Sequence, residues 1–215
     1  MNPSKPAACI GALFVLAIAS APAASQDVRL GAQLGINLST YAGEGIDGLD
    51  ERRSGVVAGV TVDYGVARTL RLETGGVWIQ KGAAGTVQGF EEAIPTRIRV
   101  SYLQVPALVR WTPLPVAPLR PSVALGPALS FETGCDYRSD PSDIAVLVGC
   151  EDEERPKIDV GVILGAALGF DVGRTAIMLE GRYDRGFRDL DAIDDVETKN
   201  SGFTLATRFT VPLGR

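Results

Sequence analysis

The clearest pattern in the chain lies between Lys157 and Asp171, where hydrophobic side chains occupy every second position. They are Ile158, Val160, Val162, Leu164, Ala166, Leu168 and Phe170. Because successive side chains of a β-strand point to opposite faces, this segment predicts a strand with one wholly apolar face and one mostly small or charged face. The alternation lasts for about 15 residues, whereas a soluble core strand keeps it for about four to eight and a strand tilted through a bilayer needs about nine to eleven.

Seven further segments show the same alternation. They cover residues 28–39, 54–64, 69–81, 98–112, 121–131, 175–185 and 202–213. The connections predicted between strands are long after the first, third, fifth and seventh strands and shorter after the others. Short turns at one end and long loops at the other are typical of membrane barrels. The pattern therefore predicts an all-β fold, a single eight-stranded antiparallel up-and-down transmembrane β-barrel.

One of these predicted strands contains a proline. Pro106 lies in the middle of the segment 98–112. Proline has no N–H to donate to the ladder, so we expect a bulge or a local bend at this position.

Alternation alone does not say which face of the barrel is wet. In a soluble, lipocalin-like barrel the apolar face points inward around a small apolar ligand, whereas in an outer-membrane barrel it points outward. The polar faces of these strands carry few charges and many glycines. A water-facing surface is normally rich in Lys and Glu, and a narrow barrel interior holds small residues and a few paired ions. We therefore expect the apolar face outside, with the soluble carrier as the alternative.

The inward faces of the predicted strands supply the candidate functional residues. We expect a polar network in the lumen made by Arg71, Glu73, Gln104, Arg110, Glu180, Arg182 and Arg208. Buried charges are costly unless they are paired, so these groups should neutralise one another. The interior of an eight-stranded barrel is just wide enough for side chains to fill, which favours a structural polar core over a transport or gating path.

The N-terminal segment differs from the rest. Residues 1–25 combine a positive charge, a short apolar run and small residues near the end, which predicts a secretory signal peptide followed by a barrel domain at 26–215. Cys9 would leave with the signal. Cys135 and Cys150 would remain in an exported chain, where an even pair indicates a disulfide that pins the loop 132–156, with two free thiols as the alternative.

The composition gives little support to catalysis or metal binding. The chain has 215 residues, a formal net charge of -5 and no histidine. It therefore lacks the usual general base and the commonest metal ligand, and its acidic balance argues against nucleic acid as a partner. Glu180 with Asp184, or Glu73 with Glu180, could form a carboxylate pair, but nearby arginines would hold both groups ionised. We expect no enzyme activity, no cofactor and no metal.

Two other groups of residues have a structural interpretation. The acidic residues between Asp189 and Glu197 lack the spacing and the glycine of an EF-hand, so we expect a solvated external loop. Aromatic residues near the predicted strand ends predict an interfacial girdle, with ordinary packing as the alternative. They are Tyr64, Trp78, Tyr102, Trp111, Phe131, Tyr183 and Phe209.

Several short motifs carry a family resemblance. They are Gly31-x-x-x-Gly35-x-Asn37-x-Ser39, Gln80-Lys81-Gly82, Tyr102-Leu103-Gln104-Val105-Pro106-Ala107-Leu108-Val109-Arg110, Gly126-Pro127 and Arg182-Tyr183. With these motifs the chain resembles the PorT-like, porin-like family of outer-membrane β-barrels. The resemblance implies an outer-membrane barrel and offers no catalytic residue. Gln104 departs from it, standing where the family often has an acid. The C-terminus also lacks the terminal aromatic residue that outer-membrane proteins commonly present to the assembly machinery.

These observations together predict a small outer-membrane barrel of a Gram-negative bacterium, exported through its signal peptide. We expect a structural or interaction role through long external loops. The expected partners are outer-membrane lipid, the barrel-assembly machinery and a protein at the external loops, with no nucleic acid. The runner-up is the lipocalin-like carrier, and a third class is a lipid-modifying enzyme that works without histidine.

Overall fold

The computed structural model describes residues 27–42, 51–88, 93–113, 119–139, 157–187 and 199–213. The predicted signal peptide at 1–25, Cys150 and the acidic segment 189–197 lie outside these residues. Within the described residues, no helix has the length and hydrophobicity needed to cross a membrane.

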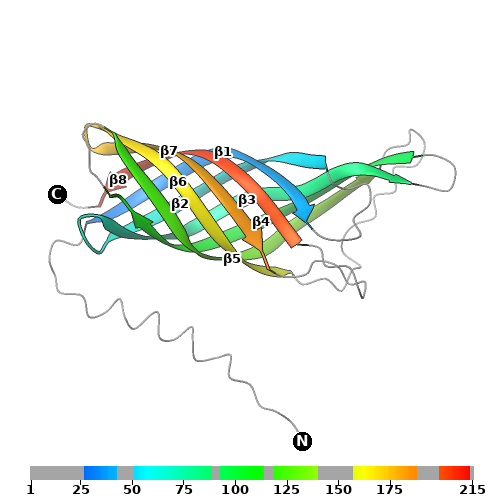
Figure 1. The fold of residues 1–215 in the computed structure, drawn as a ribbon, viewed down its shortest axis with the longest axis horizontal. Coiled ribbons are helices and arrows are strands. Elements are labelled where there is room, and N and C mark those ends of the chain that lie inside the picture. The colour runs from blue at the N-terminus through cyan, green and yellow to red at the C-terminus, as the bar shows by residue number, and fades with distance from the viewer. Residues whose placement is uncertain are drawn as a thin grey trace, which may run out of the picture.

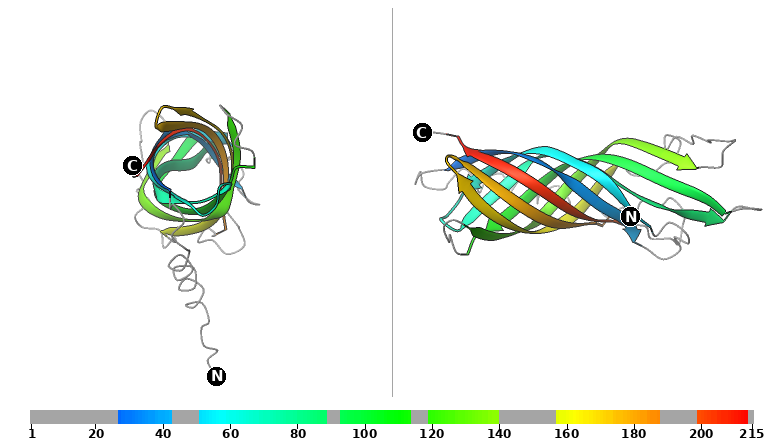
Figure 2. Two further views of the ribbon diagram at one scale, coloured as in Figure 1. Left: turned by 90° about the vertical axis from the view of Figure 1, so that its left-hand side faces the viewer. Right: turned by 90° about the horizontal axis from the view of Figure 1, so that it is seen from above.

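Eight antiparallel strands form one closed barrel in which every strand pairs with its neighbours in sequence (Figure 1). They are β1 (Val28–Ala42), β2 (Glu51–Gly65), β3 (Leu70–Gln88), β4 (Ala93–Trp111), β5 (Arg120–Ser139), β6 (Ile158–Val172), β7 (Thr175–Gly186) and β8 (Lys199–Pro212). The pairing of β1 with β8 closes the ring, which Figure 2 shows from one end. The predicted fold class is confirmed.

The connections define two ends of the barrel. Residues 66–69, 112–119 and 173–174 join strands at one end, called here the short-turn end. Residues 43–50, 89–92, 140–157 and 187–198 join them at the other, called the long-loop end after its longest connections. The predicted alternation of long and short connections is wrong for the connection after the fourth strand, 112–119, which is longer than 89–92. At the long-loop end, β3, β4 and β5 extend beyond the other strands (Figures 1 and 2).

Residues 82–97, predicted as the long connection between the third and fourth strands, belong largely to β3 and β4, so that prediction was wrong. β3 and β4 stay paired through this region, from Gly82 opposite Arg99 to Gln88 opposite Ala93. The predicted loop at 132–156 was also too long, because β5 continues to Ser139 and carries Cys135. The apolar alternation of the rest of each strand does not continue through these extensions, and the paired backbone ladder carries the strands on.

Of the bulge or local bend predicted at Pro106, the bulge does not form. Pairing of β3 with β4 is interrupted between Thr74–Ala107 and Val77–Gln104, yet the register is the same on both sides. The lost hydrogen bond is thus tolerated without an inserted residue, and no bulge forms there. The bulge in this part of the wall lies between Ser101 and Tyr102, where β4 pairs with β5.

The polarity of the barrel is the reverse of a soluble carrier. On β6, the side chains of Ile158, Val160 and Leu164 are exposed on the outside, while Asp159 and Ile163 are buried inside. The other strands repeat this arrangement, so the outer surface is a belt of Leu, Val, Ile and aromatic side chains. A surface of this kind is stable when hydrocarbon surrounds it. The prediction that the apolar face lies outside is confirmed, and this polarity is the opposite of that expected for the soluble, lipocalin-like alternative.

The aromatic residues are divided between the two faces. Trp78, Trp111, Phe131, Tyr183 and Phe209 are exposed on the outer surface, as a girdle requires. Tyr102 does not belong to the girdle, because its side chain is buried in the lumen.

Candidate functional site

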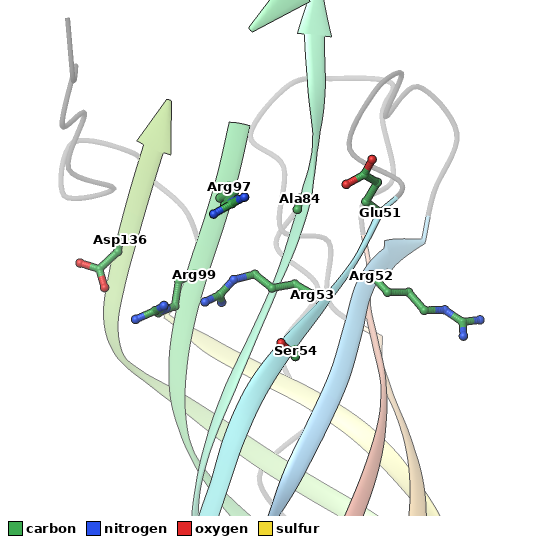
Figure 3. A pocket seen from close by; sticks show the side chains of 8 residues that line it. All are labelled: Glu51, Arg52, Arg53, Ser54, Ala84, Arg97, Arg99 and Asp136. Carbon is green, nitrogen blue, oxygen red and sulfur yellow. The ribbon is translucent and has the colours of Figure 1, made fainter. Parts of the chain in front are cut away.

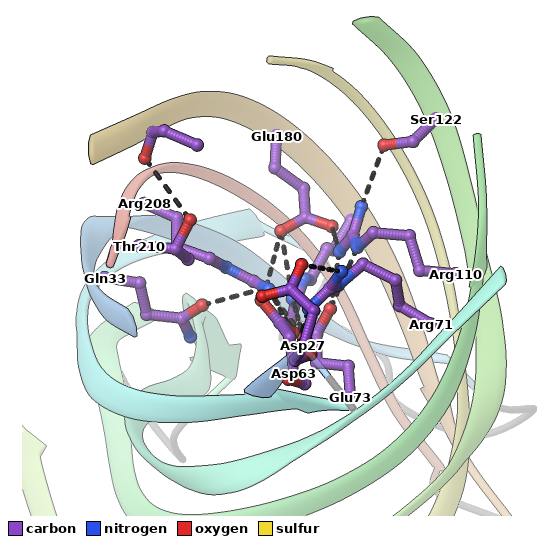
Figure 4. Close-up of polar contacts among 12 residues, drawn as sticks. Asp27, Gln33, Asp63, Arg71, Glu73, Arg110, Ser122, Glu180, Arg208 and Thr210 are labelled. Carbon is purple, nitrogen blue, oxygen red and sulfur yellow. Dashed lines mark hydrogen bonds and ion pairs between the residues drawn. The ribbon is translucent and has the colours of Figure 1, made fainter. Parts of the chain in front are cut away.

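The main polar feature of the lumen is a cluster of ionised side chains in the half of the barrel nearer the short-turn end. The ion cluster, as it is called below, consists of Asp63 from β2, Glu73 from β3, Arg110 from β4, Glu180 and Arg182 from β7, and Arg208 from β8. Each residue occupies an inward position of its strand, so barrel closure brings them together across the lumen (Figure 4).

Two glutamates hold the cluster together. Arg110 Nη2 donates to Glu73 Oε2 at 2.7 Å and to Glu180 Oε1 at 2.5 Å. Arg208 Nη2 donates to Glu73 Oε1 at 2.6 Å and to Glu180 Oε2 at 2.9 Å. Arg182 also contacts both carboxylates. Each glutamate therefore bridges three guanidinium groups.

The charges of the cluster balance. Three guanidinium groups meet three carboxylates, because Asp63 Oδ1 lies 3.7 Å from Arg208 Nη1. Glu180 and Arg208 are fully buried, and the remaining members are 5% exposed or less. Charges taken out of water are tolerated when geometry and pairing compensate the lost hydration. The cluster thus has the composition of a neutral, dehydrated plug.

Glycine makes room for this cluster. A Cβ atom added at Gly165 on β6 would lie 3.2 Å from Glu180 Oε1 and 3.3 Å from Arg182 Cγ. The long arginine and glutamate side chains occupy the space that a side chain on β6 would otherwise fill. This explains why a glycine stands at position 165.

Two of the predicted lumen residues lie apart from the cluster. Gln104 is buried, but it donates to Ser130 Oγ at 3.3 Å instead of joining the ions. Arg71 lies at the short-turn end, where Nη1 donates to Asp27 Oδ2 at 3.0 Å. Arg29 binds the same carboxylate. Burial raises the pKa of Asp27, but the hydrogen bonds from Arg29 and Arg71 outweigh it and lower that pKa below its ordinary value.

A second buried ion pair lies nearer the long-loop end. Lys81 on β3 binds Asp184 on β7, and both side chains are nearly inaccessible. Lys81 Nζ also lies 5.9 Å from the centre of the Tyr102 ring, whose hydroxyl accepts a hydrogen bond from Asn200. Sequence analysis did not predict this pair. The signal that could have found it is positional, since Lys81 shares its strand face with Glu73, and Asp184 shares its face with Glu180 and Arg182.

Apolar side chains separate the two groups of ions, so the lumen is not polar throughout. Val57, Val77, Ile79, Val100 and Tyr102 form one buried cluster, and Leu108, Ala124, Ala128 and Ile163 form another. A cavity between Arg182 and Asp184 has a volume of about 10 Å³. A single water molecule needs about 10–15 Å³. This cavity therefore has room for at most about one water molecule, and side chains occupy the lumen around it.

The two carboxylate pairs considered from the sequence, Glu180 with Asp184 and Glu73 with Glu180, are both bound by basic side chains. Glu73 and Glu180 share their arginines, and Asp184 is paired with Lys81 rather than placed beside Glu180. In the described residues, no group of histidine, cysteine, aspartate and glutamate side chains is arranged to hold a metal. The arrangement can hold strands together across the lumen, because each of these carboxylates is paired with a basic side chain from another strand.

The predicted disulfide concerns a residue at the edge of the described region. Cys135 is partly buried on β5 and packs against the cluster that contains Val57 and Val77. Cys150 lies outside the described residues, so the bridge stays a prediction.

The chain matches a family profile and resembles several solved structures of outer-membrane barrels. A family profile described as outer membrane protein beta-barrel domain matches residues 22–192. Among solved structures, the outer membrane protein OprG from Pseudomonas aeruginosa is similar with a TM-score of 0.52 at 12% identity, over 88% of this chain and 97% of that chain. The likeness to OprG, at this identity, is one of fold.

Two other structures are less similar. Neisserial surface protein A has a TM-score of 0.49 at 11% identity, over 86% of this chain and 97% of that chain. The outer membrane protease OmpT from Escherichia coli has a TM-score of 0.48 at 8% identity, over 90% of this chain and all 100% of that chain. Among curated proteins, no sequence match to the chain was found.

Proposed function

The chain belongs to the family of outer membrane protein beta-barrel domains, and from this premise we propose that it is a closed, non-enzymatic barrel that acts through its long-loop end. It forms no open pore. The observation that carries this proposal is the filled lumen, in which the balanced ion cluster, the apolar side chains and the Lys81–Asp184 pair follow one another along the axis.

The geometry at the long-loop end supports an interaction role. Strands β3, β4 and β5 carry a paired sheet beyond the rest of the wall (Figure 2). A sheet projecting from a rigid barrel can present side chains to a partner without opening the lumen. We assign the long-loop end to the cell exterior, as in barrels with short periplasmic turns. We also propose that the partner at this end is a protein. Insertion would use the barrel-assembly machinery.

We also propose that the chain belongs to the PorT-like branch of outer-membrane barrels. The stretch from Tyr102 to Arg110 resembles the PorT-like branch, and it places Tyr102, Gln104 and Arg110 in the lumen. The resemblance supports a barrel of that branch and assigns no secretion role.

Single-channel recording tests the closed lumen. Purified protein in a planar bilayer in concentrated potassium chloride should show no lasting conductance steps. A variant with Glu73→Ala, Arg110→Ala and Arg208→Ala, which removes the centre of the ion cluster, should conduct if it folds. Stable ohmic steps from the unaltered protein would contradict the proposal.

The assignment of the exterior has its own test. An epitope inserted between Asp194 and Asp195 should bind antibody on intact cells, and the same epitope between Gly173 and Arg174 should bind only after the outer membrane is opened. The reverse result would place the long-loop end in the periplasm.

A further inference from the structure

The outer surface carries an arginine-lined pocket near the long-loop end, where β2, β3, β4 and β5 lie side by side (Figure 3). Its volume is about 420 Å³. It is lined by Glu51, Arg52, Arg53, Ser54, Ala84, Arg97, Arg99 and Asp136. A volume of this size is typical of pockets that hold small molecules.

Two of the arginines, Arg53 and Arg99, lie close in the pocket, and Arg97 lies further along the same strand as Arg99. Arg97 and Arg99 lie on the outward face of β4, the face that also carries Leu103 and Val109. Figure 3 shows the side chain of Arg53 directed from β2 toward Arg99, whereas Arg52 points away. The register shift of β2 against β3, between Arg52 and Val57, is what turns this end of β2 and brings Arg53 into line with the pocket.

The charge of the pocket is opposite to that of the chain. Four arginines and two acids line it, whereas the whole chain has a formal net charge of -5. Asp136 is the cross-strand partner of Arg99, so the two acids offset only part of the positive charge, and an anion bound among the arginines would reduce the repulsion that remains between like charges on neighbouring strands. Guanidinium groups form paired hydrogen bonds with phosphate oxygens, which selects arginine for phosphate sites.

The position of the pocket along the barrel axis indicates which phosphate group it would contact. The apolar belt ends at Val56 on β2, Trp78 on β3, Leu103 on β4 and Phe131 on β5, and each of these side chains is exposed. Two residues closer to the long-loop end, the same strand faces carry polar side chains, namely Ser54, Gln80, Ser101 and Thr133. The arginines lie beyond these residues. A side chain directly above the hydrocarbon belt lies at the level of lipid headgroups.

We propose that this pocket binds the phosphorylated headgroup of a glycolipid in the outer leaflet. Arg53, Arg97 and Arg99 hold the phosphate oxygens, and the apolar belt below them contacts the acyl chains. Glu51 and Asp136, at the edges of the pocket, are placed to accept hydrogen bonds from sugar hydroxyls. This inference rests on the orientation proposed above, with the long-loop end outside.

Lipid titration tests the inference. Native mass spectrometry of the purified protein in neutral detergent would measure binding of diphosphoryl lipid A and of the same lipid without its phosphates. The unaltered protein should prefer the phosphorylated lipid. The double variant Arg97→Gln/Arg99→Gln should bind it about tenfold or more weakly, since it loses charge-assisted hydrogen bonds.

A matched control removes two arginines at the other end. Arg68→Gln/Arg174→Gln lowers the net charge by the same amount in the short connections 66–69 and 173–174, and it should leave lipid binding unchanged. Arg97→Lys/Arg99→Lys keeps the charge but not the forked geometry, and it should bind with intermediate affinity. Heat-modifiable gel mobility would verify that each variant is folded.

The possible results separate clearly. Equal binding by the arginine variant and its control, or by the lipid without phosphates, would overturn the site. Equally tight binding of soluble glucosamine phosphate would show a saccharide-phosphate site and overturn the lipid assignment. If the glutamine variant does not fold, the lysine variant and the comparison of the two lipids still test whether the pocket binds the phosphates. Because this titration involves no conductance, its failure is distinct from failure of the closed-lumen proposal.

Discussion

Glu73 and Glu180 are the residues on which the ion cluster depends, because each accepts hydrogen bonds from more than one arginine. Glu73→Gln removes one carboxylate and leaves three guanidinium groups facing two. Breaking a buried ion pair from one side costs about 3–5 kcal/mol. We expect this loss in the free energy of unfolding, measured by urea titration in lipid vesicles with tryptophan fluorescence.

Two variants serve as controls for Glu73→Gln. Glu51→Gln changes the same chemical group on the exposed rim and should alter stability by less than about 0.5 kcal/mol. The double variant Glu73→Gln/Arg110→Gln should lose less than the sum of its single variants, because the two residues interact directly. Additive losses would mean that the ion pair contributes nothing.

At the scale of single residues, Asp27 makes the stability of the folded protein depend on pH. The pKa of its carboxyl lies below the ordinary value of 3.8, so its ion pairs with Arg29 and Arg71 stabilise the folded state above that pH. This contribution is lost as the pH falls through the lower, folded-state pKa. We expect Asp27→Asn to be less stable than the unaltered protein at pH 7, and the difference in stability to shrink as the pH falls below 3.8, by the same titration. A difference that stays constant as the pH falls below 3.8 would contradict this origin.

At the scale of elements, closure of the ring depends on how closely β1 and β8 approach. Gly35 pairs with Ala206, and a Cβ atom added at Gly35 would lie 2.8 Å from the Cβ of Ala206. Gly35→Ala should therefore strain the seam and destabilise the barrel by about 1–3 kcal/mol, as overpacking does. The measurement is the temperature at which the heat-modifiable band disappears. Gly134→Ala on β5 is the matched control, because an added Cβ there meets nothing within 4 Å; equal behaviour of the two variants would contradict the argument.

At the scale of the whole molecule, the reversed polarity makes the surrounding lipid part of the fold. Leu164 is 55% exposed in the middle of β6, and Val66 is 55% exposed in a short connection. If hydrocarbon surrounds the barrel, Leu164→Arg should destabilise it by about 2–4 kcal/mol, and Val66→Arg should have little effect. Unfolding from lipid vesicles would compare the two variants. A Leu164→Arg protein as stable as Val66→Arg would show that water, not lipid, covers this face.

The strand faces were predictable from local pattern, and so were most of the lumen residues. Val77 and Ile79 weakened the apparent pattern of β3, yet they keep the inward parity of Glu73 and are buried. The extension of β3 and β4 was not predictable, since residues 82–97 have no apolar stripe. Pairing between the two strands, which no single segment encodes, continues the ladder there.

The sequence by itself determined that eight strands each have one apolar and one polar face, because a period of two is a local property of the backbone. Only the tertiary structure decided which charges meet. Lys81 and Asp184 are 103 residues apart, and Gln104 lies on the same inward face as Arg110 yet bonds to Ser130. These choices depend on the register of every strand around the closed ring, which sets the height of each side chain in the lumen. The same registers, with the shift in β2, gather the outer arginines into one pocket.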